Sequence, residues 1–445
     1  MKTISGFARI LWLKRRAVGL RMAYTGMLLV LLLPALPEVV QAQSYTNGYG
    51  IWGYTTTNAT ITITKYTGLG GRVSIPSTIN NLAVATIAGY YDSFSDWLGA
   101  FSFCNSLLSI TIPDSVTSIV SGAFDDCESL TNVMIGSGVA DIGTSAFDFC
   151  SSLTAINVDA RNSFYSSVNG VLFDKNQATL LQYPFGRSGN DAIPDTVTSI
   201  GAFSFWERYG LTGVTIPLSV TNIGADAFCN CPDLTCITIP SSVNSIGWGA
   251  FAECRSLTNA TLASGVNGLG TAVFAYSSLA AVTIPASVTS IGDYDFYSCV
   301  NLASITIAAS VTNIGVGAFV GCTSLTNVYF KGNAPAADSS LFEGDGYTTV
   351  YYLPGTTGWP TASLGVAEVL WNPQIQTASL GVRTNQRGFN ITGTSNLVIV
   401  IEATTSLSNP TWYPLQTNTL NGNPLYFTDP YWTNYPSRFY RVTWP

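Results

Sequence analysis

The chain of 445 residues contains no histidine, and only 10% of its residues are charged. Without histidine, the Ser-His-Asp and Cys-His nucleophilic mechanisms and every His-ligated zinc, iron or haem site are excluded. The low charge is unusual, because about 25% of the residues in a typical soluble domain are charged. It does not indicate disorder, since 47% of the residues are hydrophobic and 12% are aromatic. The composition therefore indicates a folded chain that lacks the commonest catalytic base.

The first 42 residues have the organisation of a secretory signal peptide. Six basic residues precede the apolar run at 27–33, and Val40-Gln41-Ala42 supplies a cleavage site before Gln43. A retained membrane anchor is the alternative, although the run is short for a span and Pro34 interrupts it. We expect cleavage after Ala42 and a location outside the cell or on its surface, with the periplasm as the alternative.

The predicted mature chain is acidic. The signal peptide holds six of the 18 basic residues and one of the 25 acidic residues, which leaves 12 basic and 24 acidic residues. Phosphate backbones and anionic membrane surfaces would repel such a chain. No apolar run after Ala42 approaches the about 18 residues that a membrane-spanning helix needs. We therefore expect no nucleic-acid partner and no transmembrane segment in the mature chain.

A period of 23 residues, shortened once to 22, organises most of the chain. Phenylalanine follows it at Phe101, Phe124 and Phe147, and again at Phe205, Phe228, Phe251, Phe274, Phe296, Phe319 and Phe342. Cysteine follows it at Cys104, Cys127, Cys150, Cys231, Cys254, Cys299 and Cys322. Such a period indicates a solenoid, in which stacked coils bury a core that no single repeat could bury alone.

The copy at 234–254 shows the role expected of each position. Its inward positions are apolar: Leu234, Ile237, Ile239, Val243 and Ile246. Thr238 points outward from the first short strand, and Pro240 ends that strand because it has no N–H for the next ladder bond. Gly247 allows the turn that follows a second extended segment. Phe251 is predicted to fill the wide end of the coil within a short helical turn.

The consensus L-x-x-I-x-I-P-x-S-V-T-x-I-G-x-x-A-F-x-x-C-x-S-L resembles the bacterial surface leucine-rich repeat family of the BspA type. The resemblance extends over residues 73–330. It implies a mainly β solenoid, a right-handed leucine-rich repeat stack of about ten 23-residue coils. It also implies a non-catalytic role in protein–protein or cell-surface interaction, such as adhesion.

Composition and spacing divide the rest of the mature chain. The alternation at 59–64 predicts an N-terminal β-hairpin cap over 43–72, followed by the solenoid over 73–332. The repeat interval lengthens at two places, which predicts irregular inserts near 90–98 and 160–185. Turn-rich residues 333–374 are predicted as a terminal cap and linker. Strand-like segments separated by turns predict a small C-terminal β-sandwich over 375–445.

Neither the cysteines nor the carboxylates form a recognisable reactive motif. We interpret the periodic cysteines as buried free thiols, with Cys229 and Cys236 best placed for a disulfide, with each other or with Cys231. Cys229-Asn230-Cys231 lacks the usual zinc spacing. The acidic residues are scattered among turns, at Asp125, Asp126, Glu128, Asp293, Asp295, Glu343 and Asp345. No pair suits glycoside hydrolysis and no loop suits calcium, so we predict no catalytic residue, no metal and no cofactor.

The outward side chains of the first strands form the candidate binding face. They are Thr111, Met134, Asn157, Thr215, Thr238, Thr261, Thr283, Thr306 and Tyr329. Threonine also suits any exposed strand, so a face without a partner is the simpler interpretation, and a threonine array that orders water is another. Because solenoids commonly bind on their extended sheet, we interpret this ladder as a recognition face. The expected partner is an extracellular protein or a cell-surface ligand.

The C-terminal segment offers an alternative function. It is rich in aromatic residues: Trp412, Tyr413, Tyr426, Tyr431, Trp432, Tyr435 and Trp444. Aromatic faces stack on sugar rings, so a carbohydrate-binding surface protein with a polysaccharide partner is the alternative. Packing within the sandwich core and along its strand edges is the structural interpretation. An enzyme is a third hypothesis, disfavoured by the absence of any catalytic motif.

Overall fold

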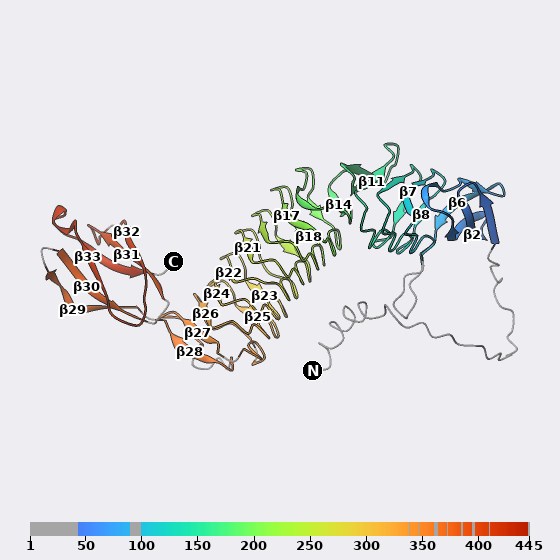
Figure 1. Cartoon of the computed structure of the whole chain (residues 1–445). Helices are drawn as coiled ribbons and strands as arrows, with labels where there is room; N and C mark the ends of the chain where they lie inside the picture. Colours follow the sequence, from blue (N-terminus) through green and yellow to red (C-terminus); the bar gives the residue numbers. More distant parts are fainter. Residues whose placement is uncertain are drawn as a thin grey trace, which may run out of the picture. The chain divides into compact units, whose positions relative to one another are not determined.

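The computed structural model describes residues 43–89, 99–337, 339–345, 347–359, 364–371, 373–383, 386–393, 397–408 and 410–443. The predicted signal peptide and the predicted insert near 90–98 lie outside these ranges. The chain forms a β-solenoid of about 12 turns followed by two small antiparallel sheets (Figure 1). It divides into two compact units, Met1–Leu257 and Thr258–Pro445. Within the described ranges, no helix has the length and hydropathy to cross a membrane.

The first unit begins with an antiparallel meander. Strands β1 (Gln43–Asn47), β2 (Gly50–Thr57) and β3 (Thr60–Thr67) pair in order, and β3 then pairs in parallel with β6 (Leu82–Ile87). The short β5 (Thr78–Ile79) also pairs with β6. The inward residues Trp52, Ile61 and Ile63 are buried. This meander occupies the segment where the sequence predicts a hairpin cap.

Each regular coil contributes one strand to each of two parallel sheets. The first sheet contains β4 (Gly71–Ser74), β7 (Leu107–Ile112), β9 (Asn132–Ile135) and β11 (Ala155–Val158). The second continues from β6 through β8 (Ser118–Ile119) and β10 (Asp141–Ile142). Past residue 178 the coils resume. The strands in the position of the first sheet are β15 (Gly189–Ala192), β17 (Leu211–Thr215) and β19 (Cys236–Ile239). Those in the position of the second sheet are β14 (Thr179–Gln182), β16 (Ser199–Ile200), β18 (Asn222–Ile223) and β20 (Ser245–Ile246).

A β-hairpin lies in the insert predicted near 160–185. Strands β12 (Tyr165–Val168) and β13 (Val171–Asp174) pair antiparallel, and β13 continues to β14. The hairpin turns at Asn169 and Gly170, whose φ angles of 50° and 78° both lie in the left-handed region. An Asn-Gly pair suits such a turn because both residues tolerate positive φ. Both parallel sheets of the solenoid are interrupted at this hairpin.

The second unit continues the repeats beyond the predicted end of the solenoid at residue 332. Its strands are β21 (Asn259–Leu262), β22 (Ala281–Thr283), β23 (Ser290–Ile291), β24 (Ser304–Ile307), β25 (Asn313–Ile314), β26 (Asn327–Phe330), β27 (Thr349–Tyr352) and β28 (Ala367–Leu370). Strands β27 and β28 pair in parallel with β26, so residues 333–374 extend the sheet and are more than a cap and linker. The ladder positions on these strands are Tyr351 and Val369, which lie 22 residues after Tyr329 and 18 residues after Tyr351, so the 23-residue period does not reveal them.

The C-terminal module contains two three-stranded antiparallel sheets. One has the order β29 (Gln374–Arg383), β30 (Gln386–Thr392) and β33 (Leu425–Asp429), and the other has β32 (Tyr413–Thr419), β31 (Val398–Thr404) and β34 (Phe439–Thr443). A short 3-10 helix, η2 (Trp432–Asn434), precedes β34. Residues from both sheets share one apolar core: Phe389, Ile391, Ile399, Ile401 and Phe427. This arrangement is the predicted small β-sandwich.

The wide end of the coils is filled by stacked phenylalanine rings. In the first unit, the Phe228 ring lies 4.6 Å from that of Phe205 and 5.2 Å from that of Phe251. The backbone around each ring forms turns, and the prediction of a short helical turn is wrong. The reason is that N–H groups here bond between coils: Phe228 N–H donates to the Ala250 carbonyl at 2.8 Å. Asn230, two residues later, adopts a left-handed φ of 55°.

Candidate binding surface

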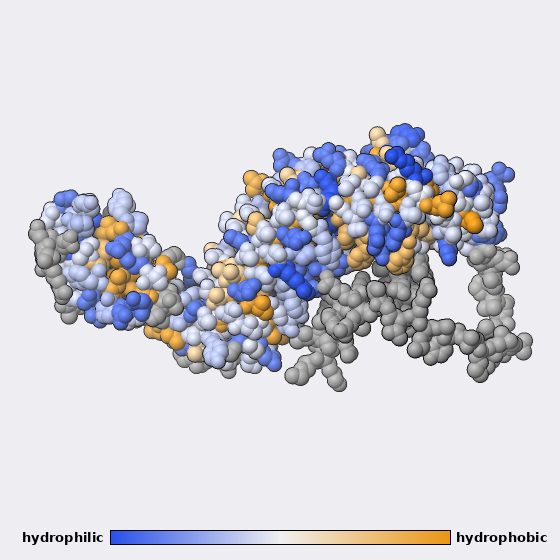
Figure 2. Space-filling model, in the orientation of Figure 1, coloured by the Kyte–Doolittle hydropathy of each residue, from blue (hydrophilic) through white to orange (hydrophobic). Residues whose placement is uncertain are grey.

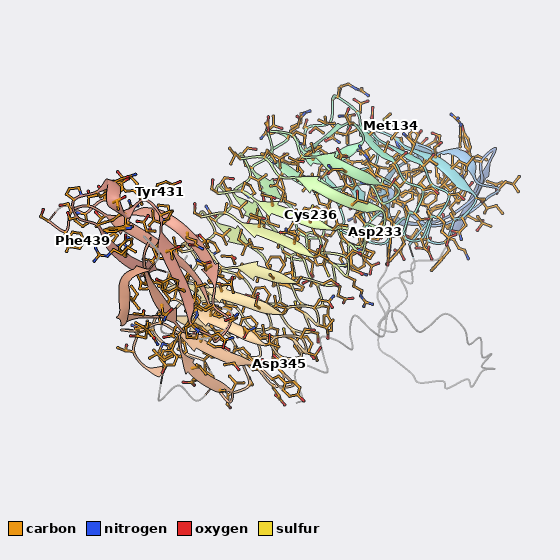
Figure 3. The ribbon with its side chains drawn as sticks, turned by 60° about the vertical axis from the view of Figure 1, so that its left-hand side comes forward. Met134, Asp233, Cys236, Asp345, Tyr431 and Phe439 are labelled. Atoms are coloured by element: carbon orange, nitrogen blue, oxygen red, sulfur yellow. The ribbon has the colours of Figure 1, made fainter. Side chains whose placement is uncertain are left out.

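The first strands present alternate side chains to the core and to solvent as predicted. On β19, Ile237 and Ile239 are buried while Thr238 between them is exposed. Strand alternation produces this split because successive side chains leave opposite faces of the sheet. Figure 3 shows Met134 on β9 and Cys236 at the start of β19 on the parallel strands of the first unit.

The predicted ladder residues stack in register along the sheets. In the first unit, Thr111 lies opposite Met134, which lies opposite Asn157. In the second unit, Thr283 lies opposite Thr306, which lies opposite Tyr329. Six of the nine are exposed, namely Thr111, Met134, Thr215, Thr238, Thr261 and Thr283, whereas Asn157, Thr306 and Tyr329 are half-buried.

The six ladder threonines differ from the other periodic threonines in their hydrogen bonding. No side chain or backbone group in the described ranges accepts from or donates to the hydroxyls of Thr111, Thr215, Thr238, Thr261, Thr283 and Thr306. By contrast, Thr221 donates to the Thr198 carbonyl in the preceding coil at 3.2 Å, and Thr131 donates to the Leu108 carbonyl at 2.9 Å. The same bond recurs at Thr117, Thr154, Thr198, Thr235, Thr289, Thr312 and Thr326. The ladder hydroxyls therefore keep their full hydrogen-bonding capacity for groups outside the fold.

Tyr329 has a structural role that the sequence did not indicate. Its ring stacks on Tyr351 at 5.2 Å and lies 4.8 Å from Trp371, and it packs against the core of the C-terminal module. Burial raises the pKa of Tyr329 above its ordinary value. The open part of the predicted face in the second unit therefore ends at Thr306. Ser74 and Ala192 extend the ladder elsewhere, since they lie opposite Thr111 and Thr215.

The face of the repeats drawn in Figure 2 carries no large apolar patch. Figure 2 shows pale and blue residues interleaved over the repeats, with hydrophobic residues in small separate groups. The ladder itself contains no Asp, Glu, Lys or Arg. Recognition by such a face would depend on hydroxyl hydrogen bonds and close contact more than on charge.

All nine cysteines are free, and the expected pairing of Cys229 with Cys236 or Cys231 is not formed. The periodic thiols have a bonding role: Cys231 donates to the Phe205 carbonyl in the preceding coil at 3.0 Å. The same bond is made by Cys127, Cys150, Cys254, Cys299 and Cys322. Burial raises the pKa of the Cys104 thiol to about 12, so it is protonated and unreactive near neutral pH.

Two charged residues occupy cysteine positions, and repeat alignment could have revealed both. Arg208 is buried, and its Nε donates to the Tyr183 carbonyl at 2.7 Å, which replaces the thiol bond of a regular coil. Its guanidinium lies 4.5 Å from the centre of the Phe185 ring. Asp345 takes the same position in the last phenylalanine coil, where burial raises its pKa to about 7.

The carboxylates are not gathered into a site. Burial raises the pKa of Asp226 to about 7 and that of Asp295 to about 8. Asp295 accepts backbone N–H groups and Asp293 accepts the Val316 N–H at 2.8 Å, so this pair serves the fold. In the part of the chain that the structure describes, no group of three or more Cys, Asp and Glu side chains is arranged to hold a metal ion.

The aromatic residues of the C-terminal module lie mostly outside its core. Tyr413, Tyr431 and Tyr435 are exposed, and Trp412, Tyr426 and Trp432 are half-buried; Trp444 lies outside the described residues. Figure 3 shows Tyr431 and Phe439 on this module. Two of these rings contact arginine side chains. The Arg441 guanidinium lies 4.4 Å from the centre of the Trp412 ring, and that of Arg438 lies 4.2 Å from the centre of the Tyr435 ring.

The stacked parallel strands, the apolar columns and the phenylalanine ladder define a leucine-rich repeat solenoid. The model of the BspA type leucine-rich repeat region matches residues 98–185, 189–303 and 289–357, in six copies. These ranges cover more than half of the chain, which therefore belongs to the BspA-type leucine-rich repeat family. A search of curated proteins returned no match.

Several solved structures of bacterial repeat proteins are similar to this chain. A leucine-rich cell surface protein from Faecalibacterium prausnitzii is 24% identical, with 66% of this chain and 96% of that chain covered and a TM-score of 0.34. A leucine-rich repeat protein from Bacteroides ovatus is 24% identical, with 73% and 76% covered and a TM-score of 0.37. The pneumococcal vaccine antigen PcpA is 16% identical, with 74% and 99% covered and a TM-score of 0.40.

Proposed function

We propose that this protein is an exported, non-catalytic repeat protein that mediates protein–protein or cell-surface interaction of the adhesion type. The contacting surface is the outward ladder, which runs from Thr111 to Thr238 in the first unit and from Thr261 to Thr306 in the second. Its partner is an extracellular protein or another cell-surface ligand. The proposal is supported chiefly by the six ladder hydroxyls, which make no bond within the described part of the chain, whereas nine other periodic threonines donate to the preceding coil. Family membership adds support, since relatives of this kind include a protein described as a cell surface protein.

A charge placed on the ladder tests this proposal. The Gln43–Pro445 chain is applied to an array of extracellular proteins and to whole cells, and the triple variant Thr215→Lys, Thr238→Lys and Thr261→Lys is compared with it. A matched control carries Thr198→Lys, Thr221→Lys and Asn244→Lys, which add the same charge immediately before strands β16, β18 and β20 of the other sheet. We expect saturable binding that the ladder variant loses and the control keeps. Equal binding by both variants would place the function elsewhere.

Carbohydrate binding by the C-terminal module is the second candidate. It is supported by the exposed rings of Tyr413, Tyr431 and Tyr435, since a ring packed in the core could not reach a sugar. A polysaccharide pull-down with the full chain and with the double variant Tyr431→Ala and Tyr435→Ala tests it. Retention lost only in the variant would favour this function. Absence of retention on every glycan would exclude it.

A further inference from the structure

The first sheet of the solenoid is interrupted between β11 and β15. Strand β11 is the last member of its sheet, and β15 begins a new sheet in which β17 is its partner. No strand of the insert runs alongside β15 on its other side. The hairpin turn lies against β11 instead, where the Ile156 N–H donates to the Gly170 carbonyl at 2.8 Å, and the β15 edge at 190–192 is left without a strand partner among the described residues.

The open edge of β15 carries main-chain groups suited to a strand. The N–H groups of Gly189 and Ile193 donate to the carbonyls of Gly210 at 2.8 Å and Thr215 at 3.1 Å. In a parallel ladder the residues that bond one neighbour alternate with those that face the other side. Asn190 and Ala192 therefore direct their main-chain groups to the open side, where both residues are exposed and the Ala192 N–H donates to Oδ1 of the neighbouring Asp191 at 2.9 Å.

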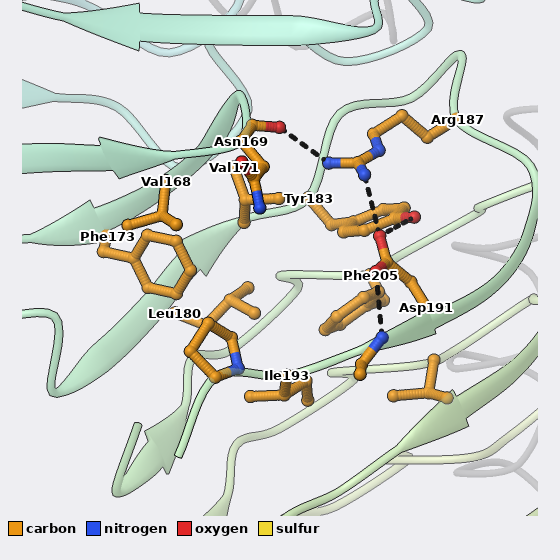
Figure 4. A pocket seen from close by; sticks show the side chains of 13 residues that line it. Val168, Asn169, Val171, Phe173, Leu180, Tyr183, Arg187, Asp191, Ile193 and Phe205 are labelled. Carbon is orange, nitrogen blue, oxygen red and sulfur yellow. Dashed lines mark hydrogen bonds and ion pairs between the residues drawn. The ribbon is translucent and has the colours of Figure 1, made fainter. Parts of the chain in front are cut away.

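A polar network spans the gap where other coils are apolar. Asp191 lies opposite Val214, at the inward position that Ile237 holds in a regular copy. It accepts a hydrogen bond from the Tyr183 hydroxyl at 2.9 Å and forms an ion pair with Arg187 at 2.9 Å. Arg187 also donates to the carbonyl of Asn169 in the hairpin turn at 2.9 Å (Figure 4). One long side chain thus bridges the hairpin and β15, and a quarter of it is exposed.

A small cavity opens beneath this bridge. Its volume is about 40 Å³, and its apolar walls come from Val168, Val171, Phe173, Leu180, Ile193 and Val214 (Figure 4). Small-molecule sites are usually several times larger, so the cavity suits a single small aliphatic side chain. An extended peptide paired with β15 would place alternate side chains toward the core side of the sheet, where the cavity lies.

We propose that the free edge of β15 binds an extended peptide segment by strand addition, with one small aliphatic side chain of that segment in the cavity. The bound segment displaces two bonds, that of Arg187 to the Asn169 carbonyl and that of the Ala192 N–H to the Asp191 carboxylate, and pairs with the main chain of Asn190 and Ala192. This site adjoins the ladder at Ala192, but it uses main-chain groups of the strand edge and the inward cavity and not the threonine hydroxyls, so neither proposal depends on the other.

A synthetic peptide with the chain's own strand pattern tests the inference. The probe is Leu-Thr-Ser-Ile-Thr-Ile, the sequence at 234–239 with serine in place of Cys236, added to the Gln43–Pro445 chain. We expect it to slow hydrogen exchange in residues 189–193. Ala192→Pro removes an edge N–H and should weaken binding at least about tenfold, as expected for the loss of one or two hydrogen bonds. Arg187→Ala removes the side chain that spans the gap, and this variant should bind the peptide at least as tightly as the unmutated chain does.

The controls separate strand pairing from simple adhesion of an apolar peptide. One probe is N-methylated on alternate residues of one edge, and a second is methylated on the other edge. If the peptide pairs with β15, only the probe whose unmethylated edge faces β15 keeps its affinity. Equal binding of both, protection outside 189–193, or no binding of the parent probe would overturn the proposal. Hydrogen exchange in β17 shows whether Ala192→Pro retains the fold.

Discussion

At the residue scale, polar side chains that depart from the repeat consensus supply hydrogen bonds where the regular stacking of the coils is interrupted. Asn162 is fully buried at the start of the insert. Its Nδ2 donates to the carbonyls of Gly136 at 3.0 Å and Val139 at 2.9 Å, and its Oδ1 accepts the N–H groups of Phe164 and Tyr165, both at 2.8 Å. One side chain thus joins the regular coil to the hairpin.

Removing the Asn162 side chain should destabilise the fold. We expect Asn162→Ala to lower the free energy of unfolding by roughly 2–4 kcal/mol, because buried carbonyls and N–H groups lose their partners. Asn157→Ala, at a half-buried position of the ladder, is the control and should change the free energy of unfolding by less than about 0.5 kcal/mol. Urea unfolding monitored by circular dichroism measures both. Similar losses for the two variants would contradict this role of Asn162.

Asp295 compensates for the 22-residue coil. In regular coils the equivalent glycine bonds a carbonyl of the preceding coil, as Gly315 N–H bonds the Ile291 carbonyl at 2.9 Å. In the shortened coil, Gly292 N–H donates instead to Asp295 at 2.6 Å, and Val273 N–H donates to it at 3.1 Å. Burial is the main cause of its raised pKa, about 8, and the negative charge of Asp293 adds to it.

The raised pKa predicts a direction of pH dependence. The folded chain holds the Asp295 proton up to about pH 8, whereas the unfolded chain releases it near the ordinary value of 3.8. Its contribution to stability is therefore full at acidic pH and is lost as the pH rises toward and through 8. The stability difference between the parent and Asp295→Ala should shrink from pH 4.5 to pH 9 in urea unfolding. Glu343→Ala, at an exposed carboxylate of the same unit, is the control and should show a difference that changes little.

At the element scale, the phenylalanine ladder contributes much of the cohesion between coils. The Phe228 ring stacks on the rings of Phe205 and Phe251, so its truncation removes two stacking contacts and leaves a cavity. The thiol column runs beside it and bonds the phenylalanine carbonyls. A repeat protein is stabilised mainly by such contacts between neighbouring repeats.

Truncation of one ring measures this cohesion. We expect Phe228→Ala to destabilise the first unit by about 3–5 kcal/mol, because the ring is fully buried between two others. Phe228→Leu keeps more volume and should cost less. The matched control is Phe103→Ala, since that ring is half exposed, and its effect should stay below about 1 kcal/mol. A thermal scan in which Phe103→Ala equals Phe228→Ala would refute the ladder's importance.

At the scale of the whole molecule, the repeats and the C-terminal module of the second unit share packing. Trp371 is buried, contacts Tyr329 of β26, and belongs to the core that contains Phe389 and Ile391 of β30. Its main-chain N–H also donates to the Tyr352 carbonyl of β27 at 2.7 Å. The last coils therefore use the module as their cap.

Loss of the Trp371 side chain should weaken the contact between the last coils and the C-terminal module. In limited thermolysin digestion of the full chain, Trp371→Ala should speed cleavage between β28 and β29 several-fold, because local opening no longer breaks a shared core. Tyr413→Ala, an exposed ring on β32, should leave the cleavage rate unchanged. Unchanged cleavage in Trp371→Ala would show that the module docks through other contacts.

The sequence alone determined the repeat period, the inward and outward positions, the free buried cysteines and the C-terminal sandwich. These follow from local periodicity, because every coil meets the same neighbours and so needs the same residue types. The missed features are those in which one coil differs from the next: β27 and β28 beyond residue 332, the Asp295 repair, and the network of Tyr183, Arg187 and Asp191. Only the tertiary structure decided these, because each depends on which groups a neighbouring coil leaves unpaired. It likewise showed which threonine hydroxyls bond within the fold and which face solvent.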